Sequence, residues 1–314
     1  RRRLRTFARL RRILKCGKTA SSPSEDYSSY SVLLSGRNAQ FTTFRHVLLI
    51  VALADELKTL RTVATDFGGV TLPKETATTT YANHSEVYPL SRVSGFRVDV
   101  LPASMGPFGP RSIGATLTDY LTKNGAVELV VLVGTAFGIS EQDQKLGDVL
   151  IGTSIFLYDR RTVINKDISF EYSYVTAQSP IVRGPAEDWI PAFQEWGNEN
   201  SVQTGCILTG GAIVQSQTFR DSLRSKANTF LDNAGAATNV IGGEMEAAGL
   251  AVLTGTAARS VPWVVVKAIM DFGTPATRQD LKDARKSAAK NAADAVFRVL
   301  RYAHAASDYT TVPS

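Results

Sequence analysis

Cysteine, histidine and long apolar runs are scarce in this chain of 314 residues. The two cysteines, Cys16 and Cys206, match no zinc-ligand spacing and form no disulfide framework, so we expect a reduced, cytoplasmic protein without a metal site. The longest apolar run, Val47–Ala54, is far shorter than the roughly 18 to 20 residues of a spanning helix. With 44% hydrophobic and 20% charged residues, the composition is typical of a globular protein.

Positive charge is concentrated at the N-terminal end. Nine of the 35 basic residues lie in Arg1–Lys18, which holds no acid, so the formal charge of +6 belongs to this segment and no specific nucleic-acid binding is expected. Residues 1–44 are basic and Ser-rich, which favours a flexible or processed leader. The alternatives are a basic amphipathic helix that contacts an acidic membrane or partner, a transit peptide, and the edge of a longer protein, since the first residue is arginine.

From residue 46 onward, strand-like and helix-like segments alternate. This alternation predicts one α/β domain over residues 45–306, with a mostly parallel or mixed central sheet flanked by helices, and a short tail over residues 307–314. The expected strands are Val47–Ala52, Phe96–Leu101, Val127–Val133, Val149–Phe156, Gly205–Thr209, Asn239–Ile241 and Val261–Ile269. The expected helices are Asp55–Val63, Ser112–Lys123, Thr218–Leu231, Glu244–Leu253 and Arg278–Ala305.

Four of these strands are followed by chemically active or small residues, and ligands of open α/β sheets bind at the carboxyl ends of the strands. Asp55 and Glu56 follow the first strand, a loop over residues 134–138 follows the third, two glutamates open a helix after Ile241, and Asp271 stands on a turn. Each acid alone has a structural explanation, such as opposing a helix dipole or capping a turn. Together they suit general acid–base chemistry at a glycosidic centre.

Four ordered motifs resemble those of the nucleoside phosphorylase superfamily, and most closely its methylthioadenosine/S-adenosylhomocysteine nucleosidase branch. They are Ala52-Leu53-Ala54-Asp55-Glu56-Leu57, Gly134-Thr135-Ala136-Phe137-Gly138 with Leu146-Gly147-Asp148-Val149, Gly243-Glu244-Met245-Glu246-Ala247, and Val264-Val265-Val266-Lys267-Ala268-Ile269-Met270-Asp271. The resemblance spans about residues 46–305. It implies a purine nucleoside or nucleotide substrate, no cofactor, and a homodimer or larger homo-oligomer.

The resemblance also implies roles for individual residues. Asp271 matches the acid that protonates the purine N7, Glu56 the group that activates water, and Glu246 the carboxylate that holds the ribose hydroxyls. Met245 matches the side chain beneath the sugar, and Thr135 lines the sugar and base site. The further substrate-binding positions that we expect are Gly134, Ala136, Ile213, Val214, Glu244 and Met270.

One position favours hydrolysis over phosphorolysis. Related bacterial phosphorylases carry a phosphate-binding arginine two residues before the glycine loop, where this chain has Leu132. Arg111, after a Gly/Pro turn, is the residue that could bind phosphate instead, although a solvated helix-start arginine is the simpler interpretation. A phosphate-dependent phosphorylase therefore stays open, as do a nucleotide-depleting effector module of a larger, defence-type protein and a binding relative without activity.

The sequence departs from the nucleosidase branch in the base site. Gly211 and Ile213 replace an aspartate and a stacking aromatic residue, so Phe137 or Phe272 is a candidate to stack on the base, and Met270 replaces a serine. Three further groups of residues carry less specific signals. Arg278 and Lys282 could contact a 5′-phosphate or form a solvated face; Tyr158 and Tyr172 could line a subunit interface; His46, His84 and His304 receive no role.

Overall fold

The chain divides into two compact units, Arg1–Asn38 and Ala39–Ser314, and the described residues all belong to the second. A computed structural model describes residues 46–67, 87–93, 96–106, 109–124, 127, 129–159, 161–164, 167–170, 173–176, 201–251, 261–275 and 278–308. The predictions for the basic tail, for Cys16, His84 and Tyr172, and for residues 309–314 lie outside these ranges.

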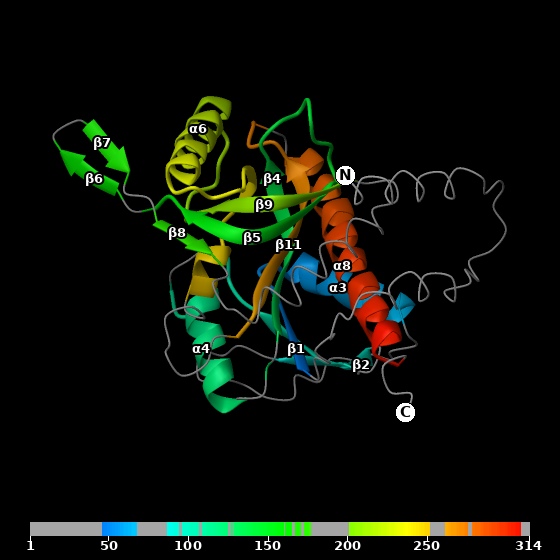
Figure 1. Ribbon diagram of the computed structural model, residues 1–314. Helices are drawn as coiled ribbons and strands as arrows, with labels where there is room; N and C mark the ends of the chain where they lie inside the picture. The colour runs from blue at the N-terminus through cyan, green and yellow to red at the C-terminus, as the bar shows by residue number, and fades with distance from the viewer. Residues whose placement is uncertain are drawn as a thin grey trace, which may run out of the picture. The chain divides into compact units, whose positions relative to one another are not determined.

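A nine-stranded mixed sheet forms the centre of the second unit (Figure 1). Its strands are β1 (His46–Val51), β2 (Tyr88–Val93), β3 (Phe96–Pro102), β4 (Leu129–Gly138), β5 (Val149–Leu157), β8 (Ser173–Thr176), β9 (Val202–Thr209), β10 (Val240–Glu244) and β11 (Trp263–Asp271). The order is β10-β9-β5-β11-β4-β1-β3-β2, with β8 beside β5. Neighbours β3, β1, β4 and β11 run parallel, whereas β2, β5 and β8 pair antiparallel with β3, β11 and β5. The predicted α/β fold class is confirmed.

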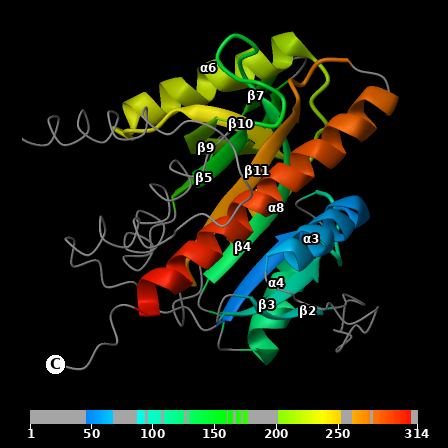
Figure 2. The ribbon, with the colours of Figure 1, turned by 90° about the vertical axis from the view of Figure 1, so that its right-hand side faces the viewer.

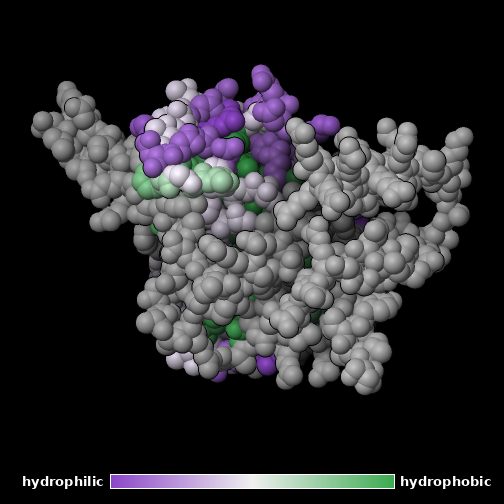
Figure 3. All heavy atoms as spheres, in the orientation of Figure 1, coloured by the Kyte–Doolittle hydropathy of each residue, from purple (hydrophilic) through white to green (hydrophobic). Residues whose placement is uncertain are grey.

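Helices cover both faces of this sheet. The α-helices are α3 (Ala54–Asp66), α4 (Ile113–Lys123), α6 (Gln217–Asn233) and α8 (Arg278–Asp308), and a 3-10 helix, η2, spans Ala247–Ala251. The helices α3 and α8 lie together on one face (Figure 2), while α4 and η2 pack on the other. The outward face of α6 is largely hydrophilic (Figure 3), and its buried side packs on a third apolar cluster with β9 and β10. The predicted helices near α3, α4, α6 and α8 are confirmed.

Burial on both faces explains the uninterrupted apolar runs. In β1, Val47, Leu49 and Val51 enter the cluster beneath α3 and α8, whereas Leu48 and Ile50 enter the opposite cluster beneath α4. Successive side chains of a strand point to opposite faces, so a strand covered on both sides needs apolar residues at every position.

The sheet closes on itself at one side. Gly242 and Gly243 of β10 pair antiparallel with Gly138 and Phe137 of β4, so that β10, β9, β5, β11 and β4 form a closed ring of strands. The pairing brings backbones close together, since a Cβ on Gly243 would overlap the Phe137 ring. Closure thereby places the end of β10 beside the end of β4.

Three local predictions were wrong. The predicted loop over residues 134–138 continues β4, because these residues pair with β11 and β10. The predicted helix Glu244–Leu253 is a strand end followed by the short η2, because Gly243 and Glu244 pair with β9. Asp271 ends β11 rather than standing on a turn. The sequence analysis also missed β2, β8 and the separate hairpin of β6 (Arg161–Ile164) and β7 (Asp167–Phe170).

A buried polar cluster joins β1, β3 and α4. The Asp99 carboxylate lies 2.9 Å from His46 Nε2 and accepts hydrogen bonds from the Tyr120 hydroxyl at 2.7 Å and from Arg97 at 2.9 Å. Burial opposes ionisation of Asp99, but its bonds to His46 and Tyr120 and the charge of Arg97 outweigh burial and lower its pKa. The cluster explains why His46 is buried without a role in chemistry.

We expect Asp99→Asn to lower the free energy of unfolding at pH 7 by about 2 to 4 kcal/mol, because it removes the buried charge that three donors share. The folded pKa of Asp99 is depressed, so its stabilisation is present above about pH 4 and is lost as the pH falls further. Denaturant titrations should therefore show that the difference between native and variant narrows below about pH 4. Arg97→Ala, which removes an exposed partner, should cost less than about 1 kcal/mol. A difference that is constant from pH 7 to pH 3 would contradict this account.

Candidate active site

Glu56 is held between the end of β1 and the strand β4. It stands in the first turn of α3, where its Oε2 accepts hydrogen bonds from the backbone N–H groups of Ala52 and Leu53, both at 3.2 Å. Its Oε1 accepts from the N–H of Thr135 at 2.9 Å and from the Thr135 hydroxyl at 3.0 Å. Only 3% of Glu56 is exposed. Burial raises its pKa, although the charge of Lys267 and the bonds from Thr135 oppose the shift.

The glycine at position 134 is required by this contact. Gly134 has φ +156°, and a Cβ there would lie 2.6 Å from Glu56 Oε1. No side chain fits such a gap without moving the carboxylate. The small residue therefore allows the close approach of Glu56 to β4, at a position where the sequence predicted a loop of small residues.

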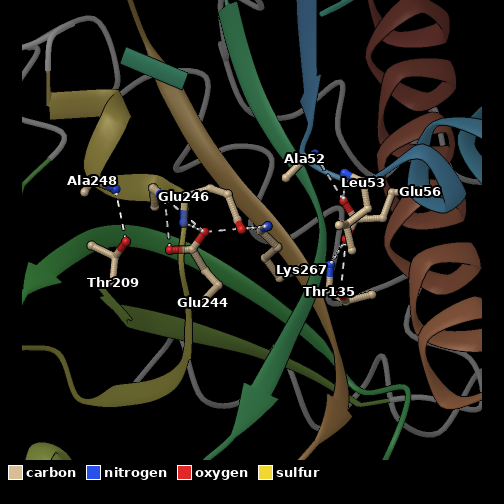
Figure 4. A network of polar contacts seen from close by, with 10 residues as sticks. Ala52, Leu53, Glu56, Thr135, Thr209, Glu244, Glu246, Ala248 and Lys267 are labelled. Atoms are coloured by element: carbon tan, nitrogen blue, oxygen red, sulfur yellow. Dashed lines mark hydrogen bonds and ion pairs between the residues drawn. The ribbon is translucent and has the colours of Figure 1, made fainter. Parts of the chain in front are cut away.

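Lys267 links the other two carboxylates. Its Nζ donates a hydrogen bond to Glu246 Oε2 at 3.0 Å and lies 3.6 Å from Glu244 Oε2. Glu244 also accepts hydrogen bonds from the N–H groups of Glu246 and Ala247 at 2.9–3.0 Å, which fixes the turn between β10 and η2. Figure 4 shows Lys267 between this pair and Glu56.

Lys267 was assigned no role from its place in the sequence. The sequence did carry a signal, because Lys267 stands inside an otherwise apolar strand and would therefore be buried. A fully buried cation needs an anionic partner. The structure leaves 0% of Lys267 exposed. Burial alone would lower its pKa, but the charges of Glu246, Glu244 and Glu56 outweigh burial and raise it, so the ammonium stays charged.

The single positive charge of Lys267 cannot balance three ionised carboxylates. Three buried carboxylates surround one ammonium group. Burial raises the pKa of Glu244 against the charge of Lys267, and the charge of Glu246 adds to the rise, so uptake of a proton by Glu244 is favoured over that by a free carboxylate. Glu246 is 5% exposed and remains the direct hydrogen-bonding partner of Lys267. Hydrogen-bonded and charge-paired groups of this kind keep their geometry before any ligand arrives.

Asp271 ends the strand beside β4. In the pairing of β11 with β4, Asp271 lies opposite Phe137, two residues beyond Thr135. The half-buried Asp271 therefore lies near the same end of β4 as Thr135, the residue that donates hydrogen bonds to Glu56. Its Oδ1 accepts a hydrogen bond from the Gly273 N–H at 2.7 Å. Burial raises the pKa of Asp271, against the Gly273 bond and the charge of Arg285. A carboxyl group in this state can hold a proton and release it to a substrate.

The turn before β5 supports the end of β11. Asp148 is buried and accepts hydrogen bonds from the N–H groups of Lys145 at 2.9 Å and Ser201 at 3.2 Å, and its own carbonyl accepts from Ile269. Gly147, with φ +88°, donates its N–H to the Ile269 carbonyl. The Leu146–Val149 motif thus holds β11 just before Asp271.

The remaining predicted site residues differ in burial and belong to different apolar clusters. Ala136 is buried in the cluster beneath α4, Met245 is half-buried, and Met270 packs partly against the cluster beneath α8. Val214 is buried in the third cluster, whereas the neighbouring Ile213 is 66% exposed. The two candidate stacking residues differ as well: Phe137 packs over Gly243, and Phe272 is half-buried beside Gly138.

Two other features are absent from the part of the chain that the structure describes. Within the ranges given above, no group of three or more His, Cys, Asp or Glu side chains could hold a metal ion. Across the same part of the chain, no helix combines the length and apolar character needed to cross a membrane.

We expect Lys267→Met to lower the free energy of unfolding by about 3 to 5 kcal/mol, because it leaves Glu246 and Glu244 buried without their cation. Adding Glu246→Gln to Lys267→Met should recover part of this loss, and a double-mutant cycle in denaturant measures the recovery. As a control, Lys123→Met removes an exposed ion pair with Asp119 and should cost less than about 1 kcal/mol. Equal losses in both lysine variants would refute a central role for Lys267.

Comparison with known proteins identifies the family of this chain. Among curated protein sequences, none matches the chain. Similar solved structures include 5′-methylthioadenosine/S-adenosylhomocysteine nucleosidase of Neisseria meningitidis in complex with methylthio-immucillin-A (19% identity, TM-score 0.61, 82% of this chain and 99% of that one). They also include futalosine hydrolase of Helicobacter pylori (15%, 0.60, 82% and 98%) and S-adenosylhomocysteine nucleosidase of Streptococcus pyogenes (19%, 0.60, 83% and 98%). Because the model of the phosphorylase superfamily matches residues 46–301, the chain belongs to that superfamily.

Proposed function

We propose that the protein hydrolyses the N-glycosidic bond of a purine nucleoside or nucleotide and releases the free base. The observation that carries the proposal is the set of acids at neighbouring strand ends. Glu56 and Glu246 are buried in a network around Lys267, and Asp271 ends the strand that carries this lysine. The solved structures similar to this chain are named as nucleosidases and a hydrolase, which supports the same reaction class.

Asp271 acts as the general acid. Cleavage breaks the bond between C1′ and the purine N9, and the electron pair of that bond leaves with the base. A proton from Asp271 to the purine N7 neutralises the developing negative charge. The raised pKa of Asp271 favours the protonated form that this step needs.

Glu56 acts as the general base. It accepts a proton from the water whose oxygen attacks C1′, so that the products are the free base and the sugar with a hydroxyl at C1′. The raised pKa of Glu56 makes the carboxylate a stronger proton acceptor, while its four hydrogen bonds from Ala52, Leu53 and Thr135 keep it in place.

Glu246 binds the ribose hydroxyls and stabilises the transition state. Loss of the base leaves an oxocarbenium-like sugar cation, which buried carboxylates stabilise electrostatically. The bond from Lys267 fixes Glu246, and Glu244 holds the backbone on which it stands. In this proposal Met245 packs beneath the sugar, and the substrate pocket includes Gly134, Thr135, Ala136, Val214, Ile213 and Met270.

Phosphorolysis is the less favoured reaction. The position that would carry a phosphate-binding arginine is Leu132, which is fully buried in the cluster beneath α4. A side chain at this position of β4 faces the core, whereas Arg111 lies exposed in the turn before α4. The proposal therefore assigns the attacking role to water.

The proposal includes a homo-oligomer that works in the cytoplasm. Cys206 is a free, buried thiol whose pKa burial raises to about 12, so it is a packing residue rather than a reactive one. Such a cysteine fits a reducing compartment.

We expect Asp271→Asn and Glu56→Gln each to lower kcat for purine release by about 10²- to 10⁴-fold, because each removes one proton-transfer group. The measurement is chromatographic detection of free base from adenosine, methylthioadenosine, S-adenosylhomocysteine, inosine, AMP and ATP. The exposed Asp232→Asn of α6 is the matched control and should keep native activity. Native kcat in both acid variants would sink the assignment of roles.

We also expect base release to be independent of inorganic phosphate. Identical progress curves with and without phosphate, and a free sugar rather than a sugar 1-phosphate as the second product, would establish hydrolysis. A strict requirement for phosphate would instead identify a phosphorylase and would overturn the argument from Leu132.

A further inference from the structure

A groove of about 820 Å³ lies between α3 and α8, on the face of the sheet opposite α4. The two helices run side by side there (Figure 2). Both begin at the carboxyl ends of sheet strands, since α3 follows β1 and α8 follows β11. The groove is therefore built on the two elements that carry Glu56 and follow Asp271.

Positive charge dominates the α8 wall of the groove. This wall carries Lys282, Arg285, Lys286 and Lys290 against one acid, Asp283. Lysines at positions 282, 286 and 290 repeat every four residues and so form one stripe along the helix. Among the described residues, no carboxylate forms an ion pair with any of these three lysines, which leaves their charges available to a ligand.

The α3 wall is more nearly balanced. It adds Lys58 and the acids Asp55 and Asp66, together with the hydroxyl-bearing Thr59 and Thr62. Over both walls the groove has five cationic and three anionic side chains. The excess is positive and lies mainly on α8.

Arg285 carries an unsatisfied donor in this groove. Its Nε is buried and has no hydrogen-bond partner. An unpartnered buried donor is costly, and a guanidinium group pairs most strongly with carboxylate or phosphate oxygens. Because Arg285 lines the groove, an anionic ligand there would pair with its guanidinium group.

Two residues that line the groove are related to the proposed active site. Asp55, which lines the groove, directly precedes Glu56, and the positive charge of Arg285 acts on Asp271. A ligand that spans both regions would place its sugar and base among the acids and an anionic extension along α8.

We propose that this groove binds the 5′-phosphate chain of a purine nucleotide, so that the preferred substrate is a nucleoside phosphate rather than an uncharged nucleoside. The inference rests on the proposed function and adds its substrate class. Lys282 and Lys286 attract the phosphates as point charges, and Arg285 donates to their oxygens from the end nearest the acids. Asp55 and Asp283 lie at the groove as well and limit how many phosphates can be held.

The test compares base release from adenosine, AMP and ATP by the native chain and by Lys282→Ala/Lys286→Ala. We expect the native kcat/KM to be at least about tenfold higher for a nucleotide than for adenosine, and the double variant to lose this preference while adenosine release stays within about twofold. The control variant Lys123→Ala/Lys226→Ala removes the same charge from exposed positions outside the groove and should keep the preference. Equal native kcat/KM for adenosine and nucleotides, or equal losses on all three substrates, would overturn the proposal.

Calorimetry tests the groove without turnover. Native protein should bind ATP and inorganic tripolyphosphate, and the double variant should bind both at least about tenfold more weakly. Inorganic phosphate and adenosine are measured as well, because each represents one part of a nucleotide. A general anion site should bind tripolyphosphate as tightly as ATP, whereas a nucleotide site should bind ATP more tightly than tripolyphosphate, phosphate or adenosine. If no substrate releases base but this weakening is seen, the proposed hydrolysis fails and the groove stands. If binding is unchanged in the variant, the groove assignment fails whatever the activity.

Discussion

The fully buried ammonium group of Lys267 is the interaction on which the site depends. Glu244, Glu246 and Glu56 are all buried, and anions taken out of water are tolerated only with compensating charge or hydrogen bonds. Lys267 supplies the charge, and backbone N–H groups at two chain turns supply the hydrogen bonds. The resulting acids are held rigidly and have raised proton affinity at Glu56 and Glu244, which is the state that acid–base chemistry uses.

Closure of the sheet brings these groups together. Glu56 belongs to the first described strand–helix unit, Glu246 follows β10, and Lys267 and Asp271 belong to β11. Pairing of β10 with β4 folds the sheet into a ring, and pairing of β4 with β11 sets Thr135 beside the strand that carries Lys267. Three distant parts of the sequence thus contribute to one polar network inside an apolar fold.

The same architecture relates the proposed active site to the groove between α3 and α8. Each helix starts where a strand of the site ends, so the side chains of its first turns lie near the acids and those of later turns extend away from them. In the function that we propose, a long substrate uses both regions: the buried carboxylates act on the glycosidic bond, and the cationic stripe on α8 binds charge at a distance from that bond.

Local pattern in the sequence was sufficient to predict several strands and the approximate place of three acids. Doubly covered strands need continuous apolar runs, so β1 and β11 were predictable, and Glu56, Glu246 and Asp271 could be placed near strand ends. Their resemblance to family motifs suggested their roles. Pairing between distant strands was not predictable from local pattern. The tertiary structure alone extended β4 through Gly138, placed Glu244 at a strand end, gave Lys267 its carboxylate partners and left Ile213 exposed. The physical reason is that a strand is determined by its neighbours' backbone hydrogen bonds and a buried charge by its counter-charge, and both partners lie far away in the sequence.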